Sequence, residues 1–315
     1  MILTGPGNRN TLRPVAKLTE KRVSLIGAGV ILAAAVVYAT CGAGEGVARI
    51  SYRDLAGKLD ASELTPTETK ALDVLLNQEV SPCGDDVSLG ASLFAPESCP
   101  LAPLAAEFIV SMLKEDYNVE EISTAYVSRY AAVKGLEIPV DGSPRMGAQK
   151  PSITVVVFSD FECPFCSKAA ERLERLALEY PEHVAVVYKN YPLAVHPTAE
   201  LAARAGFAAA RQDKFWDMHD TLFSAQGSPL DRERILTMAL GLGLDVDAFE
   251  KDMASPEATS AIEEDRKLGH GLGVTGTPAL FVNGRLLPGG LPELDARIRE
   301  EFLRAAVKER SSQKN

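Results

Sequence analysis

The sequence of 315 residues is poor in the motifs that mark nucleotide-binding, nucleic-acid-binding and metal-binding proteins. It has no glycine-rich phosphate loop of the P-loop or dinucleotide-binding type. Its formal net charge of -10 would repel a phosphate backbone, which argues against nucleic-acid binding. Only four histidines and five cysteines are present, and a structural zinc site would need a second close pair of them beside the one Cys-x-x-Cys. We therefore expect neither a metal nor an organic cofactor.

The net negative charge lies entirely after residue 22. Residues 1–22 carry a formal charge of +4, which leaves -14 for the rest of the chain. This basic segment, expected in the cytoplasm, precedes 18 uncharged residues at 23–40, VSLIGAGVILAAAVVYAT. A basic start before an apolar run of this length predicts an inner-membrane anchor that sends the rest of the chain across. A signal peptide cleaved after Ala39 and lipidation at Cys41 are the alternatives, and all three export the chain to the periplasm or cell-envelope face.

Residues 60–133 have the periodicity of a small all-α module. Thr65 as a cap, Pro66 at the first helical position and Glu68 three residues after the cap mark the start of its first helix. The sequence leaves three roles open for this module: to hold a partner, to form a dimer, or to support the rest of the chain.

Two cysteines within this module, Cys83 and Cys99, are separated by 16 positions. In an exported protein such a pair predicts a structural disulfide, and a loop of that size contributes about 3 kcal/mol on the chain-entropy estimate. A relay that passes electrons to the other cysteines is the alternative role for this pair.

A different pattern begins at residue 151, after a polar linker with several Gly and Pro residues at 134–150. The valine-rich run ITVVVFS at 153–159 is typical of a strand buried on both faces. The elements expected after it are a helix from Cys166 onward, a strand HVAVVYKNY, helices between about 196 and 271, two short strands around Asn283-Gly284, and a helix from about 292 to 308. Residues 151–310 therefore predict an α/β sandwich with a helical insertion.

Cys163 and Cys166 stand where the first strand of this sandwich gives way to a helix. The unpaired N–H groups and the positive dipole of a helix N-terminus favour a thiolate at Cys163, which is the expected nucleophile. Cys166, one turn further, is placed to resolve a mixed disulfide at Cys163. Pro164 suits the first turn, where its missing N–H is not needed. Thiol–disulfide chemistry is therefore favoured over half of a metal site and over two inert buried thiols.

Three stretches together resemble the DsbA-like branch of the thioredoxin superfamily. They are FSDFECPFC, NYPLAVHPTAELAARAGFAAARQDKFWDMHDTLF and GVTGTPALFVNG, and the resemblance covers about residues 150–307. It implies a thioredoxin fold with an inserted helical domain, and thiol:disulfide oxidoreductase activity on cysteine-containing exported proteins. It also implies a cis peptide before Pro278, with the backbone of Thr277 pairing with the substrate. A membrane redox partner is implied too, either a quinone-linked reoxidase or a thiol carrier.

The residues around the two cysteines depart from the strongly oxidising members of this family. Phe165 stands where those enzymes often have histidine, and Glu162 places a negative charge next to Cys163. Both should stabilise the thiolate less and make the disulfide a weaker oxidant. An oxidase that introduces disulfides is the first expectation. A reductase or isomerase, and a non-catalytic peptide-binding or chaperone protein with this fold, are the alternatives.

Four other polar residues invite a functional interpretation. Asp160 is either a proton acceptor that tunes the cysteine pair or a cap of the helix, and capping is slightly favoured. Lys189 is expected to be an exposed residue at a strand end. His196 and His219 are expected to serve packing or the surface.

Overall fold

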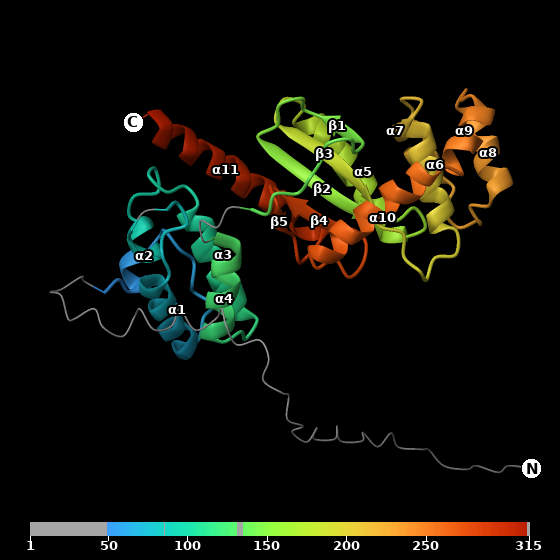
Figure 1. Ribbon diagram of the computed structural model, residues 1–315. Coiled ribbons are helices and arrows are strands. Elements are labelled where there is room, and N and C mark those ends of the chain that lie inside the picture. Colours follow the sequence, from blue (N-terminus) through green and yellow to red (C-terminus); the bar gives the residue numbers. More distant parts are fainter. Residues whose placement is uncertain (1–48, 85, 131–134, 314–315) are drawn as a thin grey trace, which may run out of the picture. The chain divides into compact units, whose positions relative to one another are not determined.

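The computed structural model describes residues 49–84, 86–130 and 135–313 (Figure 1). The apolar segment at 23–40 and Cys41 lie outside these residues, so the expected anchor or signal is not described. In the part of the chain that is described, no helix combines the length and the apolarity that crossing a membrane requires.

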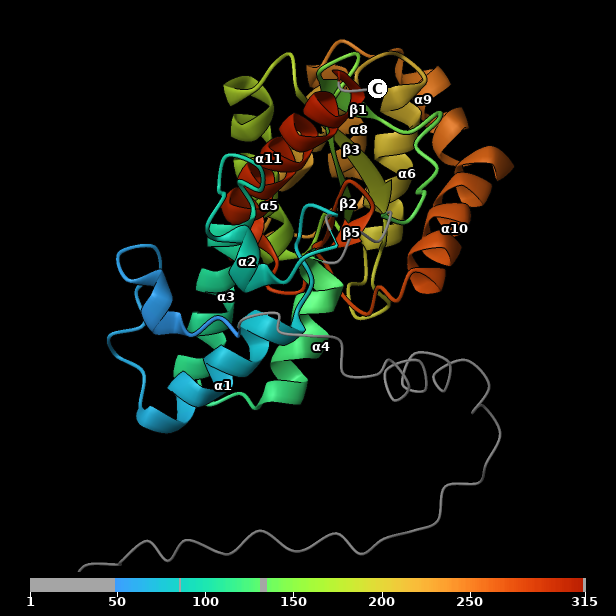
Figure 2. The ribbon, with the colours of Figure 1, turned by 90° about the vertical axis from the view of Figure 1, so that its left-hand side faces the viewer.

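Residues 52–130 form a helical module (Figure 2). It consists of η2 (Tyr52–Leu55), α1 (Pro66–Gln78), α2 (Leu89–Ser92), α3 (Ala102–Lys114) and α4 (Val119–Tyr130). The first helix begins with the capping box expected from the sequence. Thr65 Oγ1 accepts from the Glu68 N–H at 3.3 Å, and Glu68 Oε2 accepts from the Thr65 N–H at 2.6 Å. Cys83 and Cys99 are joined by a disulfide with an S–S distance of 2.05 Å.

The second part of the chain has a thioredoxin-like fold, as the sequence predicts. Its elements are β1 (Arg145–Gly147), β2 (Ile153–Ser159), α5 (Pro164–Glu179), β3 (Val184–Asn190), α6 (Ala199–Ala210), α7 (Phe215–Ser224), α8 (Arg232–Gly241), α9 (Val246–Met253), α10 (Pro256–Gly271), β4 (Ala279–Val282), β5 (Arg285–Leu286), η3 (Leu291–Glu293) and α11 (Leu294–Gln313). The five strands form one sheet in the order β1-β3-β2-β4-β5, in which β2 and β3 are parallel and the other pairs antiparallel. Helices α6 to α10 are the insertion (Figure 1).

The central strands β2 and β3 are covered on both faces, which explains their continuous apolar sequence. Val155 and Val157 point to a core shared with α5, α11 and the inserted helices. Val156 and Phe158 alternate with them and pack on the other face against Val274 and the C-terminal part of α10. The apolar clusters on the two faces of the sheet together hold β2, and with it the turn that follows β2, in place.

One strand lies where the sequence predicted only a linker. Residues 145–147 form β1, which pairs antiparallel with β3 at the edge of the sheet. At Gly147, with φ +86°, an added Cβ would meet the Val184 carbonyl oxygen at 2.3 Å. Glycine is therefore required for this close approach of the two backbones. The linker prediction was wrong here because a three-residue edge strand contributes too few apolar side chains to be recognised.

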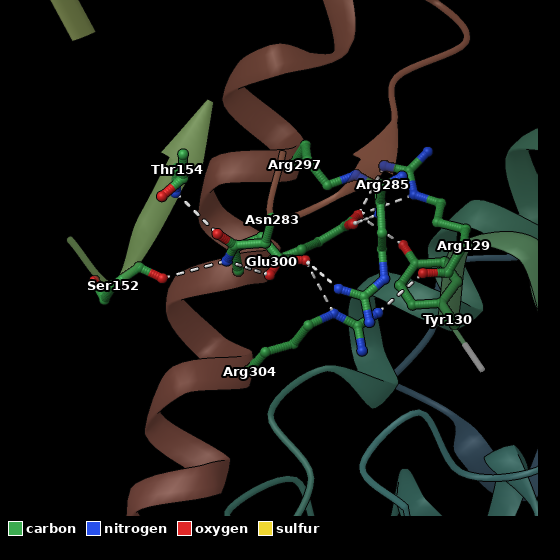
Figure 3. Close-up of polar contacts among 10 residues, drawn as sticks. Arg129, Tyr130, Ser152, Thr154, Asn283, Arg285, Arg297, Glu300 and Arg304 are labelled. Atoms are coloured by element: carbon green, nitrogen blue, oxygen red, sulfur yellow. Dashed lines mark hydrogen bonds and ion pairs between the residues drawn. The ribbon is translucent and has the colours of Figure 1, made fainter. Parts of the chain in front are cut away.

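A buried ionic contact joins α11 to the helical module (Figure 3). Glu300 is only 2% exposed, and its Oε1 accepts from Arg129 Nη2 at 2.7 Å and from the Tyr130 hydroxyl at 2.9 Å. Arg304 adds a bond from its Nη2 to the Arg129 carbonyl oxygen at 2.9 Å. We call Glu300, Arg129 and Tyr130 the α4–α11 joint.

The neighbouring Glu301 ties the same helix to the sheet. Its Oε2 accepts from Asn283 Nδ2 at 2.9 Å, and its Oε1 lies 3.3 Å from Arg285 Nη1. Asn283 in turn accepts the Thr154 N–H of β2 at 2.9 Å. One turn of α11 is therefore bonded both to the helical module and to the turn between β4 and β5.

Candidate active site

The turn after β2 places Cys163 at the N-terminus of α5. Cys163 is the N-cap residue, with extended backbone angles and no side chain capping the helix, and Pro164 is the first helical residue. The Cys163 thiol is 5% exposed and donates to the Thr277 carbonyl oxygen at 3.3 Å. The Thr277-Pro278 peptide bond is cis, as the resemblance implies. The fold therefore brings a cysteine at a helix N-terminus against a backbone carbonyl 114 positions away in sequence.

Cys166 lies beneath Cys163 and is almost fully buried, at 1% exposure. Both cysteines are free thiols in this structure. Burial raises the pKa of the Cys166 thiol to about 12. The Ser159 hydroxyl, the Asp160 backbone N–H and Thr277 pull this pKa down by a smaller amount. The Asp160 N–H donates to Cys166 Sγ at 3.4 Å. Both cysteines are thus buried, Cys166 more completely than Cys163.

Asp160 does not cap α5, so the slightly favoured prediction was wrong. Its carboxylate is 2% exposed and accepts from the Glu162 N–H and the Leu193 N–H, each at 2.8 Å. The same carboxylate lies 2.7 Å from His196 Nδ1. Capping failed because Asp160 lies three positions before the N-cap, where its side chain instead holds the loop after β3.

Glu162 makes a second bond to the loop after β3. Its Oε2 accepts from the Thr198 N–H at 2.6 Å, at the start of α6. The carboxylates of Asp160 and Glu162 therefore fasten residues 193–198 to the cysteine turn. Phe165, between the cysteines, is 65% exposed and offers an apolar surface without charge.

Gln226, at the end of α7, was missed by the sequence analysis. Its Nε2 donates to the Phe161 carbonyl at 2.7 Å and to the Cys163 carbonyl at 3.0 Å. It thereby holds the backbone of the cysteine turn from the inserted helices. A lone glutamine after an amphipathic helix carries no signal of such a contact in sequence, because the partners are more than 60 positions away.

Burial corrects the expectation for Lys189 and agrees with the one for His219. Lys189 is not an exposed strand-end residue, since it is 6% exposed and its Nζ lies 3.0 Å from Asp265 Oδ1 on α10. His219 is buried at 4% exposure, in keeping with packing, and its Nδ1 lies 2.8 Å from Asp220 Oδ1. Among the described residues, no group of three or more His, Cys, Asp and Glu side chains is placed to hold a metal ion.

Comparisons with known proteins agree with this geometry. A family model described as the DSBA-like thioredoxin domain matches residues 154–296. The chain is 36% identical over 180 residues to the Na(+)/H(+) antiporter NhaA 3 of Salinispora tropica, covering 55% of this chain and 27% of the antiporter. It is 35% identical over 175 residues to the antiporter NhaA of Herminiimonas arsenicoxydans, covering 54% and 27%. The chain thus spans about a quarter of the length of these curated relatives.

A solved structure of a thioredoxin-like oxidoreductase from Silicibacter pomeroyi is also similar. It has 30% sequence identity and a TM-score of 0.47, and the match covers 51% of this chain and 92% of that one. The matched family model spans β2, both cysteines, the inserted helices and the cis-proline loop. Residues 154–296 of the chain therefore match the DSBA-like thioredoxin domain, a domain of thiol:disulfide oxidoreductases.

Proposed function

We propose that the protein is an exported thiol:disulfide oxidoreductase that acts on cysteine-containing proteins through Cys163 and Cys166. The observation that carries this proposal is the position of Cys163. Its thiol lies at the N-terminus of α5, 3.3 Å from the Thr277 carbonyl and beside the cis Pro278. A helix N-terminus favours the thiolate, which is the reactive form of cysteine.

The reaction proceeds by two exchanges at one sulfur. When a substrate disulfide is reduced, the Cys163 thiolate attacks one substrate sulfur and the other leaves as a thiolate, which forms a mixed disulfide. Cys166 then attacks Cys163 Sγ, so the Cys163–Cys166 disulfide forms and the substrate thiolate departs. Oxidation of a substrate dithiol follows the same steps in reverse.

Substrate is held by backbone rather than by side-chain pockets in this proposal. An extended polypeptide laid beside Thr277 pairs with its main chain, so that many sequences are accepted. Exposed Phe165 adds an apolar contact next to the reacting sulfur. This arrangement suits an enzyme that processes many exported proteins.

We propose disulfide introduction as the direction, with reduction or isomerisation as the rival. Phe165 and Glu162 supply no positive charge near Cys163, which favours a milder oxidant than an enzyme with histidine in the dipeptide. Reoxidation by a quinone-linked membrane protein, or reduction by a membrane thiol carrier, would complete the cycle. The anchor or signal at 23–40 supports a location outside the cytoplasm. The chain covers only 27% of the length of the NhaA 3 antiporter that it resembles. Sodium–proton exchange is therefore no part of the proposed function.

The test of this function is the reduction potential of the Cys163–Cys166 pair, together with the activity of a Cys163→Ser variant. The protein is equilibrated in glutathione buffers, and its thiols are trapped for mass spectrometry. A potential near or above about -180 mV supports a disulfide donor, and one near about -270 mV supports a reductase.

The control for this test is the double variant Cys83→Ser/Cys99→Ser, which removes the other cysteine pair. It should keep the exchange activity, whereas Cys163→Ser should lose it. If Cys163→Ser keeps the biological activity, or if the two thiols never form a disulfide, the protein is a binding protein and the proposed function is wrong.

A further inference from the structure

A small cavity of about 10 Å³ lies behind the buried cysteine. Its polar lining comes from Ser159 on β2, Cys166 on α5, Tyr188 on β3 and His219 on α7. The rest of the wall is mostly apolar, and includes Leu173. A cavity of this size holds about one water molecule, provided that two to four polar groups face it. Four polar side chains line this cavity among mostly apolar neighbours, so the residues that could bond such a water are present.

The Tyr188 hydroxyl is a buried polar group that other protein atoms leave unsatisfied. Tyr188 is 1% exposed, and in the described part of the chain its hydroxyl makes no hydrogen bond. A buried hydroxyl without a partner destabilises the folded state, and a polar partner in the cavity would remove that cost. Because Tyr188 lines the cavity, a water there would satisfy its hydroxyl.

His219 faces this cavity in one defined tautomer. Asp220 Oδ1, 2.8 Å away, accepts the proton on Nδ1, so Nε2 is left as the acceptor nitrogen of the neutral ring. The side chain of Asp220 is 61% exposed and that of His219 is 5% exposed. Aromatic rings hold the imidazole in place, namely those of Phe161, Tyr188, Phe215, Trp216 and Phe223. The pair therefore links a buried cavity to a carboxylate at the surface.

The titratable groups around the cavity are few among the described residues. Cys166 and Tyr188 line it together with His219, and Asp220 bonds to the outer nitrogen of the ring. Asp160 and Asp265 act on the Tyr188 hydroxyl by charge from a greater distance. Cys163 acts on Cys166 in the same way.

Asp160 is the rival proton acceptor, and its contacts disfavour it. Both of its carboxylate oxygens are engaged, by the Glu162 and Leu193 N–H groups and by His196. The group that Asp160 presents to Cys166 is its backbone N–H, which is a donor. His196 is bonded to this carboxylate and does not line the cavity.

We propose that His219 accepts the proton of the Cys166 thiol during the resolving step, through the Tyr188 and Ser159 hydroxyls and one water in the cavity. The inference rests on the proposed function. As Cys166 attacks, its sulfur electron pair forms the Cys163–Cys166 bond and the bond between Cys163 and the substrate sulfur breaks. The substrate sulfur leaves with that electron pair as a thiolate, and the proton of Cys166 moves to Nε2 of His219. In the reverse direction the same proton returns to Cys166, so no external oxidant or reductant is involved.

Burial of Cys166 explains why a proton acceptor is useful here. With a pKa raised to about 12, Cys166 would be a thiolate in about one molecule in 10⁵ at neutral pH. The thiolate is the attacking species, so an unassisted resolving step would be slow. Imidazole is the side chain that ordinarily changes charge near neutrality, which suits it to this transfer.

The experiment isolates the resolving step in the full-length protein. Cys163 is converted at low pH to a mixed disulfide with thionitrobenzoate, and release of the coloured thiolate by Cys166 is followed by stopped flow after jumps to higher pH. Formation of the mixed disulfide in a Cys166→Ser background measures the first step alone. The variants are His219→Gln and Tyr188→Phe, and His183→Gln is the matched control, because His183 packs on Phe302 and does not line the cavity.

We expect His219→Gln to slow release about a hundredfold at neutral pH, the lower part of the range for general base catalysis. Its rate should then keep rising with pH where the wild-type rate has levelled off. Tyr188→Phe should slow release about tenfold and still fold, because the lost hydroxyl has no protein partner. In both variants the first step should stay within about twofold of wild type, and His183→Gln should match wild type throughout.

Unchanged release rates and pH profiles in both His219→Gln and Tyr188→Phe would overturn the inference, and so would an equal loss in both steps, which is the mark of a packing role. If His219→Gln does not fold, Tyr188→Phe decides between these outcomes. Failure of wild-type Cys163 to react with the reagent at all would instead overturn the proposed function.

Discussion

Two acidic residues beside the cysteines, Asp160 and Glu162, have a structural role that the sequence did not reveal. Asp160 and Glu162 hold the loop at 193–198 through hydrogen bonds to its backbone N–H groups and to His196. The sequence suggested redox tuning for both residues and, for Asp160, slightly favoured a helix cap instead. The bonds to the loop could not be foreseen, because they join positions more than 30 residues apart. The influence of Glu162 on the redox potential remains a prediction.

Replacing Glu162 with glutamine separates its charge from its hydrogen bond. Glu162→Gln keeps an oxygen for the Thr198 N–H and removes the negative charge beside Cys163. The reduced form should be stabilised, because the Cys163 thiolate no longer faces that charge, and the reduction potential should rise by about 10–30 mV. Equilibration in glutathione buffers measures it, with Glu171→Gln on the exposed side of α5 as the control. An unchanged or lower potential would show that the charge does not act on the cysteine.

The buried thiol of Cys166 should make the stability of the reduced protein depend on pH. Its pKa rises from an ordinary 9.0 to about 12 on folding, so the fold favours the protonated thiol. That contribution is complete below about pH 9 and is lost as the pH rises toward 12, by about 1.4 kcal/mol per unit. Urea unfolding of the reduced protein at several pH values across this range, compared with Cys166→Ser, measures it. Parallel curves for the two proteins would contradict the expectation.

Among the secondary-structure elements, those with buried apolar runs were predictable from sequence and those defined by long-range contacts were not. Strands β2 and β3 and helix α5 follow from valine runs and helical spacing, and the Asn283-Gly284 turn from its dipeptide. Strand β1 escaped prediction because its three residues pair through backbone alone. The position of Gln226 depends on how the inserted helices pack, which no local pattern encodes.

The α4–α11 joint should be a main support of the helical module. Glu300→Ala leaves the partly buried Arg129 without its carboxylate and removes the acceptor of the Tyr130 hydroxyl. Breaking a buried pair in this way costs about 3–5 kcal/mol. Urea unfolding followed by circular dichroism should show this loss, whereas Glu309→Ala on the exposed part of α11 should stay within about 0.5 kcal/mol of wild type. Equal effects of the two substitutions would mean that the joint adds no stability.

At the scale of the whole molecule, charge divides the chain into a basic N-terminal segment and an acidic remainder. Residues 1–22 carry a formal +4 and the rest carries -14, with the apolar run at 23–40 directly after the basic segment. Such asymmetry sets the orientation of a membrane-inserted chain. Together with the Cys83–Cys99 disulfide, it is consistent with folding in an oxidising compartment.

Deleting residues 23–40 should keep the protein in the cytoplasm. The full-length chain is expected to fractionate with membranes and to resist alkaline extraction, because an uncleaved apolar run of 18 residues holds it there. Protease added to spheroplasts should degrade the full-length protein and spare the deletion variant. A full-length protein recovered in the soluble periplasmic fraction and starting after Ala39 would establish the cleaved signal instead.

The short edge strands of the sheet would matter if the protein meets unfolded chains, as the proposed function requires. The two outer positions of the sheet are taken by β1 and β5, which have three and two residues. Such brief edges offer almost no ladder of free N–H and C=O groups on which another chain could add a strand. Another polypeptide therefore finds little backbone at these edges with which to pair and aggregate. In the proposed function, the pairing open to it is the short, transient one beside Thr277, from which it would be released once its sulfur has exchanged.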